Sequence, residues 1–156
     1  PKLLIADEPT TAVDVTIQAQ LLDLIKSLAR ERGMAVLFVT HDLGVVSETC
    51  DRMITMYAGR IVERGPVAEV LASPGHPYTM GLLAALPSPE SRGERLATIP
   101  GRVPPPGTTV EGCVFRPRCP FAIDECTRPQ ALIPLSDARE ARCIRSRELD
   151  FQGVAL

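Results

Sequence analysis

The chain has 156 residues, of which 45% are hydrophobic and 23% charged, and its formal net charge is −2. This length and composition are typical of a globular domain and argue against a disordered chain. The slightly negative charge gives no basic footprint, which argues against nucleic acid as the main ligand, and no apolar run approaches the roughly 18 residues that a membrane-spanning helix needs.

The first predicted element is a strand over residues 3–6, which are continuously apolar and are followed by Asp7 and Glu8. Such a run is typical of a strand covered on both faces of a parallel sheet, and ligands usually bind at the polar end of such strands. An amphipathic helix is expected next, because Asp14 can cap its start and Gly33 can end it. Its apolar positions recur at helical spacing and are Ile17, Leu21, Leu24, Ile25 and Leu28.

A second buried strand is predicted over residues 35–39, and Asp42 can cap a short helix after it. The sequence then indicates a β-hairpin with strands over 52–57 and 60–63 and its turn at Ala58-Gly59, followed by short helices over 67–72 and 78–86. Strands that alternate with helices favour an α/β fold with a largely parallel sheet.

The composition changes after residue 86. Six prolines lie between residues 87 and 107, and they deny the backbone the donors and angles of regular structure. We interpret residues 87–112 as a linker or extended strap that leads into a Cys-rich module over 113–143. Residues 144–156 form a tail without a readable signal.

Asp7 and Glu8 provide the two kinds of group that hydrolysis of a phosphoanhydride needs. One carboxylate can hold Mg²⁺, which takes only one or two protein carboxylates, and the other can orient or deprotonate the attacking water. An isolated Asp-Glu pair is more often an N-cap or a solvated loop, so the context decides. The 156 residues contain no G-x-x-x-x-G-K-[ST] phosphate-binding loop.

The residues around Asp7 and Glu8 form a recognisable motif. Residues 3–14, LLIADEPTTAVD, resemble the Walker B strand and D-loop of ATP-binding cassette (ABC) ATPases, and Thr40-His41-Asp42 resembles their switch histidine. The resemblance implies Mg²⁺-ATP coordination by Asp7, a general-base or water-positioning role for Glu8, a γ-phosphate contact for His41, and a D-loop role for Asp14. Val13 departs mildly from the leucine that the family usually has there.

Four of the five cysteines, Cys113, Cys119, Cys126 and Cys143, are spaced C-x5-C-x6-C-x16-C. Four thiolates suit either a tetrahedral zinc or a [4Fe-4S] cluster, and the absence of a closely spaced pair makes zinc the weaker alternative. Unligated or disulfide-linked thiols are a third alternative, which a reducing compartment makes less favourable. Cys50 is expected to be a packed side chain. Five arginines could offset thiolate charge or lie on the surface: Arg116, Arg118, Arg128, Arg139 and Arg142.

The same region resembles the C-terminal extension of oligopeptide/dipeptide importer ATPases, through His76-Pro77-Tyr78-Thr79 and the Cys-Pro at 119–120. Some members carry a [4Fe-4S] cluster there, so the resemblance implies that the four cysteines are its ligands, in a structural staple rather than an electron carrier. The implied fold is the C-terminal half of a P-loop NTPase (ABC ATPase) core over residues 1–86, with the extension after it.

The resemblance implies the ATP-binding, ATP-hydrolysing subunit of a peptide importer at the cytoplasmic face of the membrane. Its partners would be a second ABC ATPase subunit, two permease subunits and, indirectly, an extracytoplasmic peptide-binding protein. Because the Walker A, Q-loop and signature motifs of the family lie upstream of Walker B, we expect the 156-residue chain alone to be an inactive fragment. The alternatives are a non-catalytic metal-binding or regulatory remnant, and a P-loop ATPase that works on DNA or in iron-sulfur assembly.

Overall fold

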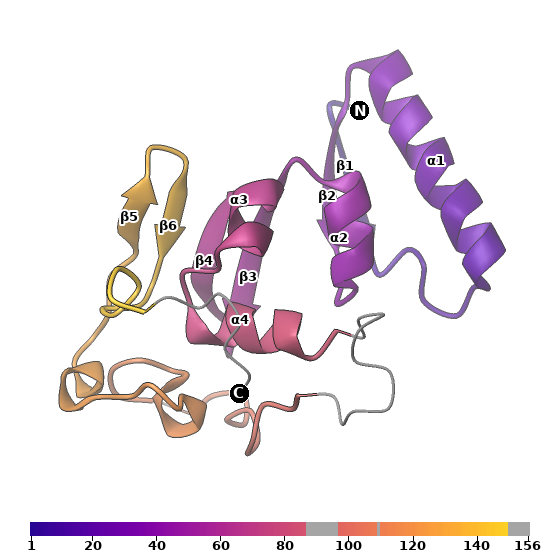
Figure 1. Ribbon diagram of the computed structural model, residues 1–156. Coiled ribbons are helices and arrows are strands. Elements are labelled where there is room, and N and C mark those ends of the chain that lie inside the picture. Colours follow the sequence, from indigo (N-terminus) through magenta and orange to yellow (C-terminus); the bar gives the residue numbers. More distant parts are fainter. Residues whose placement is uncertain (87–96, 109, 150–156) are drawn as a thin grey trace. The chain divides into compact units, whose positions relative to one another are not determined.

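The structure is a computed structural model, which describes residues 1–86, 97–108 and 110–149. The chain forms two compact units, Pro1–Asp51 and Arg52–Leu156, which we describe separately (Figure 1). The predicted division into 1–86, 87–112, 113–143 and 144–156 stays a prediction. The parts of it that fall on residues 87–96, 109 and 150–156 lie outside the described residues.

The first unit contains the predicted strand, helix, strand and helix. These are β1 (Leu3–Asp7), α1 (Val15–Arg32), β2 (Ala35–Val39) and α2 (Leu43–Thr49). The strands β1 and β2 are parallel and pair in register from Leu3 opposite Ala35 to Asp7 opposite Val39. Because the strands run the same way, the loops that follow Asp7 and Val39 leave the sheet at the same edge.

The helix boundaries follow the capping residues that the sequence predicts. Asp14 Oδ1 accepts a hydrogen bond from Ile17 N at 3.0 Å, which satisfies a free N–H of the first turn of α1. Gly33 ends α1 in the left-handed conformation, with φ of 59°, and its N–H donates to the last carbonyls. Asp42 caps α2 by accepting from Gly44 N at 2.8 Å.

The burial in this unit differs from the prediction. Leu22 and Ile25 are the buried residues of α1, whereas Leu24 is 54% exposed, so the buried stripe is rotated relative to the predicted one. The strands were expected to be covered on both faces, but Ile5 of β1 and Leu37 of β2 are 62% and 47% exposed. That expectation is wrong for the described residues, because no described helix covers this face of the two-stranded sheet.

The second unit is built on an antiparallel sheet of four strands in the order β3-β4-β6-β5. Its elements are β3 (Arg52–Tyr57), β4 (Arg60–Pro66), α3 (Val67–Ala72), α4 (Pro77–Ala84), the 3₁₀ turns η2 (Arg116–Arg118) and η3 (Asp124–Thr127), β5 (Ile133–Ser136) and β6 (Arg139–Ala141). The predicted hairpin is confirmed, and its turn residues Ala58 and Gly59 both have positive φ, 47° and 75°, as a tight two-residue turn requires.

The sequence did not predict β5 and β6, nor that β6 pairs with β4 through Glu63 opposite Ala141. The mixed α/β class and the loop-rich character of the Cys-rich segment are confirmed. The antiparallel sheet is nevertheless larger than expected, because the segment adds two strands to it. Pairing across more than 70 residues leaves no local pattern, and strands of three and four residues are too short to show alternation.

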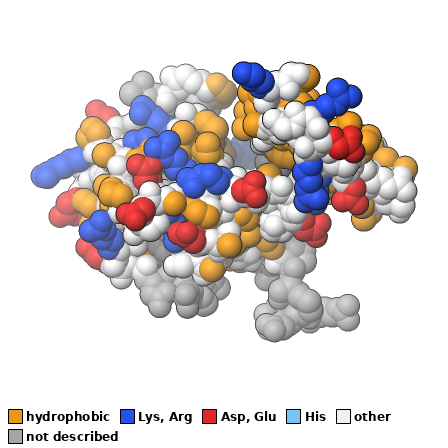
Figure 2. Space-filling model, turned by 90° about the horizontal axis from the view of Figure 1, so that it is seen from above, with side chains coloured by type: hydrophobic (Ala, Val, Ile, Leu, Met, Phe, Trp, Pro, Cys, Tyr) orange, Lys and Arg blue, Asp and Glu red, His pale blue; other side chains and the backbone are white. Residues whose placement is uncertain are grey.

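The Cys-rich segment shares its core with the hairpin. A buried cluster joins Tyr57 and Val62 to Val114 and Phe115, and the Tyr57 and Phe115 rings meet edge to face at 5.2 Å. The described part of the predicted linker is tied to this core, because Arg118 donates to the carbonyls of Ile99 and Pro100. Figure 2 shows basic and acidic side chains interspersed on the face in view, in keeping with the small net charge.

Candidate functional site

The ends of β1 and β2 bring a carboxylate and an imidazole into contact. Glu8 follows β1, and its backbone N–H donates to Val39 O at 2.8 Å, which extends the parallel ladder past Asp7. His41 follows β2, and its Nδ1 lies 2.8 Å from Glu8 Oε1. Thr11 Oγ1 donates to the other carboxylate oxygen at 3.0 Å. The Glu8 carboxylate is therefore fixed by side chains from both sides.

Glu8 and His41 shift each other's pKa in opposite directions. The hydrogen bond from His41, and then the one from Thr11, lowers the pKa of Glu8, while the hydrogen bond to Glu8 raises the pKa of His41. Both side chains are open to solvent, His41 at 83% and Glu8 at 37% exposure, so a ligand can reach them. Glu8 also has a φ of 46°, which is unusual for a residue other than glycine and is a feature of ligand sites.

The other two predicted site residues of this unit are placed differently. Asp7 is the last residue of β1, next to Glu8 in sequence, and it is exposed. Asp14 is used locally as the cap of α1. Thr11 was not predicted as a site residue. Its position three residues after Glu8 in a turn, where Thr11 N also donates to Glu8 O, could have indicated it.

The second candidate site is a cavity that all four predicted cysteine ligands line. Cys113, Cys119, Cys126 and Cys143 are free thiols around a space of about 10 Å³, enough for about one water molecule. Among the described residues, no three His, Cys, Asp or Glu side chains are grouped so as to hold one metal ion. The thiols are thus gathered around one space without forming the ligand set of a mononuclear metal.

Burial raises the pKa of three of these thiols, to about 11 for Cys119 and about 12 for Cys143, and the neighbouring sulfurs raise it further. Backbone amides oppose this effect. Each of these three cysteines accepts from the amide two residues later in the chain, on Phe115, Phe121 and Arg145 respectively. Amides directed at sulfur stabilise a thiolate. Cys113, Cys119 and Cys143 are therefore protonated at neutral pH unless a bound cation offsets their charge.

Most of the five predicted arginines serve other acceptors. Only Arg116 lines the cavity, where Arg145, which was not predicted, joins it. Arg118 and Arg142 donate to backbone carbonyls, and Arg139 pairs with Glu63. These three arginines therefore make structural hydrogen bonds and ion pairs, and they do not surround the thiols with positive charge.

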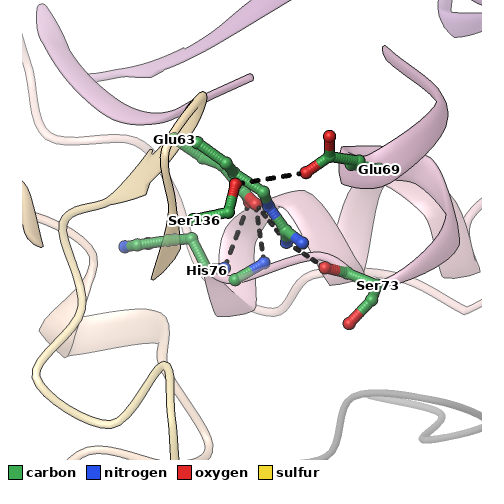
Figure 3. A network of polar contacts seen from close by, with 7 residues as sticks. Glu63, Glu69, Ser73, His76 and Ser136 are labelled. Carbon is green, nitrogen blue, oxygen red and sulfur yellow. Dashed lines mark hydrogen bonds and ion pairs between the residues drawn. The ribbon is translucent and has the colours of Figure 1, made fainter. Parts of the chain in front are cut away.

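A buried polar network, drawn in Figure 3, includes His76, which also lines this cavity. Glu63 of β4 is fully buried and accepts from Gly75 N at 2.7 Å, His76 N at 3.1 Å and the Arg139 guanidinium at 2.9 Å. Arg139 also donates to Ser73 O. The sequence analysis missed this pair, although a glutamate in a strand next to the buried Val62 is a signal of a buried charge with a partner.

Comparison with known proteins gives consistent results. Residues 62–126 match the family described as the C-terminal region of oligopeptide/dipeptide transporters. A protein of Brucella ovis named "Putative peptide import ATP-binding protein" is 55% identical over 96% of this chain and 46% of its own length. A protein of Brucella abortus with the same description is 50% identical over 92% of this chain and 43% of its own. The chain spans about half the length of the curated relatives it matches.

Among solved structures, cbiO1 from Clostridium perfringens, part of the ABC transporter complex cbiONQ, is 35% identical over 46% of this chain and 29% of its own chain, with a TM-score of 0.44. The resemblance to ATP-binding subunits of oligopeptide/dipeptide ABC importers is confirmed by the family match and the Brucella relatives.

Proposed function

We propose that residues 1–51 supply the hydrolytic half of an ATP site that powers peptide import. The proposal is supported by the similarity of 96% of this chain to a peptide import ATP-binding protein. The observation that carries the proposal is the contact between Glu8 and His41 across the ends of two parallel strands. This is the edge at which open α/β sheets bind ligands, and both groups are accessible there.

In this proposal each residue has a separate task. Glu8, held ionised by its two hydrogen bonds, accepts a proton from or orients the attacking water. His41 carries an N–H close to the same point and can donate to a phosphate oxygen once the nucleotide displaces it from Glu8. Asp7 has hard oxygen donors that fit Mg²⁺, which supplies neutralisation of phosphate charge when bound. Asp14 belongs to the loop that would face a second subunit.

The proposed setting is an ABC importer. No helix within the described residues is long and apolar enough to cross a membrane. The proposed partners, which the resemblance to peptide import ATP-binding proteins supports, are two membrane-spanning permease subunits, a second ATPase subunit, and an extracytoplasmic peptide-binding protein that acts through the permeases. The subunit would lie at the cytoplasmic face of the membrane as a peripheral component.

The proposal is tested with a chimera in which the residues preceding the matched region in the Brucella ovis relative are joined to this chain. We expect the chimera to hydrolyse ATP and the 156-residue chain alone to remain at background. Glu8→Gln should lower the rate by about 10²–10⁴-fold, as loss of a general base does, while nucleotide binding persists. Glu31→Gln, the same change on exposed α1, is the matched control. A Glu8→Gln chimera as active as the control would contradict the proposal.

The cysteine cavity supports a second proposal, that the extension holds a [4Fe-4S] cluster. The donor set fits in kind, because four free thiols line one space and amides are directed at three of them. Each thiolate of such a cluster binds a different iron, so the ligands need not meet at one point as zinc requires. When bound, the cluster would provide the positive charge that makes the thiols ionise.

Iron, sulfide and zinc analysis of the anaerobically purified chain, with its visible absorption spectrum, tests this second proposal. We expect about four irons for each chain, their loss in Cys126→Ser, and their retention in Cys50→Ser, which changes a thiol in the other unit. A content of one zinc ion for each chain, without iron, would instead indicate a mononuclear zinc site and contradict the cluster proposal. An active chimera without metal would leave the first proposal standing alone, whereas an inactive chimera that binds iron would favour a regulatory remnant.

A further inference from the structure

His76 connects the buried network of Glu63 with the cavity of the four thiols. Its backbone N–H donates to Glu63 Oε2 at 3.1 Å, and its Nδ1 accepts from Tyr78 N at 3.0 Å as the cap of α4. The residue is 1% exposed, and its ring lies 5.8 Å from that of Phe115. Backbone, ring face and ring nitrogen are thus each held, so the orientation of the imidazole is fixed.

The capping bond also fixes the tautomer of the ring. A neutral imidazole has one N–H, and because Nδ1 accepts a hydrogen bond, the proton is on Nε2. Burial lowers the pKa of His76 to about 3, so the ring is neutral throughout the physiological range. Nε2–H is therefore the single donor of a buried side chain.

The side chain that carries this donor lines the thiol cavity. Figure 3 shows the imidazole directed away from the Glu63 carboxylate, and His76 lines the cavity together with all four cysteines. Within the described residues, the side chain of His76 makes its hydrogen bond through Nδ1, and Nε2 has no acceptor there. A buried donor is costly without an acceptor, and the sulfur atoms are acceptors that the cavity offers.

Capping alone does not explain a histidine at this position. Ser, Thr, Asp and Asn are the preferred N-cap residues, and Asp14 and Asp42 perform that task on α1 and α2 in this chain. The imidazole differs from these side chains because it has a second nitrogen on the far side of the ring. That nitrogen is free of the capping bond, on a residue that also lines the cavity.

We propose that His76 is a positioning residue that donates its Nε2–H to sulfur at the site of Cys113, Cys119, Cys126 and Cys143. The inference rests on the proposed [4Fe-4S] cluster as the occupant. A thiolate or cluster sulfur is a stronger acceptor than a thiol, so the bond strengthens when the site is loaded. Through its backbone contact with Glu63, His76 thereby ties the loaded site to β4 and to the buried ion pair.

Two variants of His76 separate the two ring nitrogens. His76→Asn places an amide oxygen near the position of Nδ1, which keeps the cap and removes the donor. His76→Gln places an N–H near the position of Nε2, which keeps the donor and weakens the cap. Ile144→Val, a change of apolar lining in the same cavity, is the control. Iron and sulfide content and the midpoint potential of the cluster are measured for each.

Hydrogen bonds to cluster sulfur favour the more negative, reduced form and so raise its potential. We expect His76→Asn to retain iron and sulfide but to lower the midpoint potential of the cluster. The expected shift is ~59 mV, which for one electron changes the ratio of reduced to oxidised cluster about tenfold at a given potential. His76→Gln should shift it less, and Ile144→Val should leave it unchanged. A cluster in His76→Asn with the wild-type potential would overturn the inference while leaving the cluster itself established.

A second measurement does not depend on iron or on folding of the variants. ¹⁵N chemical shifts of the His76 ring in the unmodified chain distinguish the Nε2–H from the Nδ1–H tautomer. We expect the Nε2–H form, and the Nδ1–H form would overturn the inference. Failure of the wild-type chain to take up iron would instead remove the cluster proposal, and with it this role of the donor.

Discussion

Glu63→Gln should destabilise the second unit by about 4 kcal/mol, because it removes the carboxylate that pairs with the buried Arg139 guanidinium. Glu63 is fully buried and the side chain of Arg139 is 10% exposed, so water cannot replace the lost charge. Breaking a buried ion pair from one side costs about 3–5 kcal/mol, since the remaining charge stays buried without its partner. The amides of Gly75 and His76 would also lose an ionised acceptor.

The magnitude can be compared with an exposed pair in the same sheet. Arg64 and Glu140 form a salt bridge with side chains 45% and 31% exposed, and such pairs contribute about 0–1 kcal/mol. Glu140→Gln is therefore the matched control. Combining Glu63→Gln with Arg139→Met should recover part of the loss, because no buried charge then remains.

Urea unfolding followed by tyrosine fluorescence measures this unit specifically. The chain has two tyrosines and no tryptophan, and Tyr57 and Tyr78 both lie in the second unit, with ring centroids 4.7 Å apart. With an m-value of about 2 kcal/mol/M, the expected loss lowers the midpoint by about 2 M urea. A midpoint for Glu63→Gln within about 0.5 M of that for Glu140→Gln would refute the reasoning, because the buried pair would then be worth no more than the exposed one.

Three further predictions concern single positions. Gly112→Ala should destabilise the Cys-rich segment by about 3 kcal/mol in thermal unfolding, because a Cβ there would lie 2.2 Å from the carbonyl oxygen of Cys126 and φ is +75°; an unchanged melting temperature would contradict the close approach. Asp14→Ala should cost about 1 kcal/mol and reduce helical circular dichroism through loss of the cap of α1, and Asp14→Asn should preserve it. His41 should titrate above pH 6.5 by NMR and return towards that value in Glu8→Gln. The pair stabilises the fold only while His41 is protonated and Glu8 ionised, so its contribution is lost as pH rises through the raised pKa of His41 or falls through the lowered pKa of Glu8; equal His41 titrations in both proteins would exclude the coupling.

Local features were predictable because local chemistry produces them. Asp14 and Gly33 bound α1 as expected, and Ala58-Gly59 forms the turn of the hairpin, since caps and tight turns depend on side chains and angles within a few residues. The contact between Glu8 and His41 has a similar origin, because parallel neighbouring strands place both at one edge of the sheet. The catalytic role assigned to that contact stays a proposal.

The sequence by itself determined the order of the elements from β1 to α4, the family resemblance and the four cysteines, because these depend on residue type and spacing. Only the tertiary structure decided that β6 pairs with β4, that Glu63 meets Arg139, and that the ring of His76 lines the thiol cavity. Residues 63 and 139 lie far apart in the chain, and neither has a neighbouring residue that signals the other. Their pairing follows from the need to satisfy buried charges and backbone groups once the sheet has closed, which is a property of the packed chain and not of any short segment.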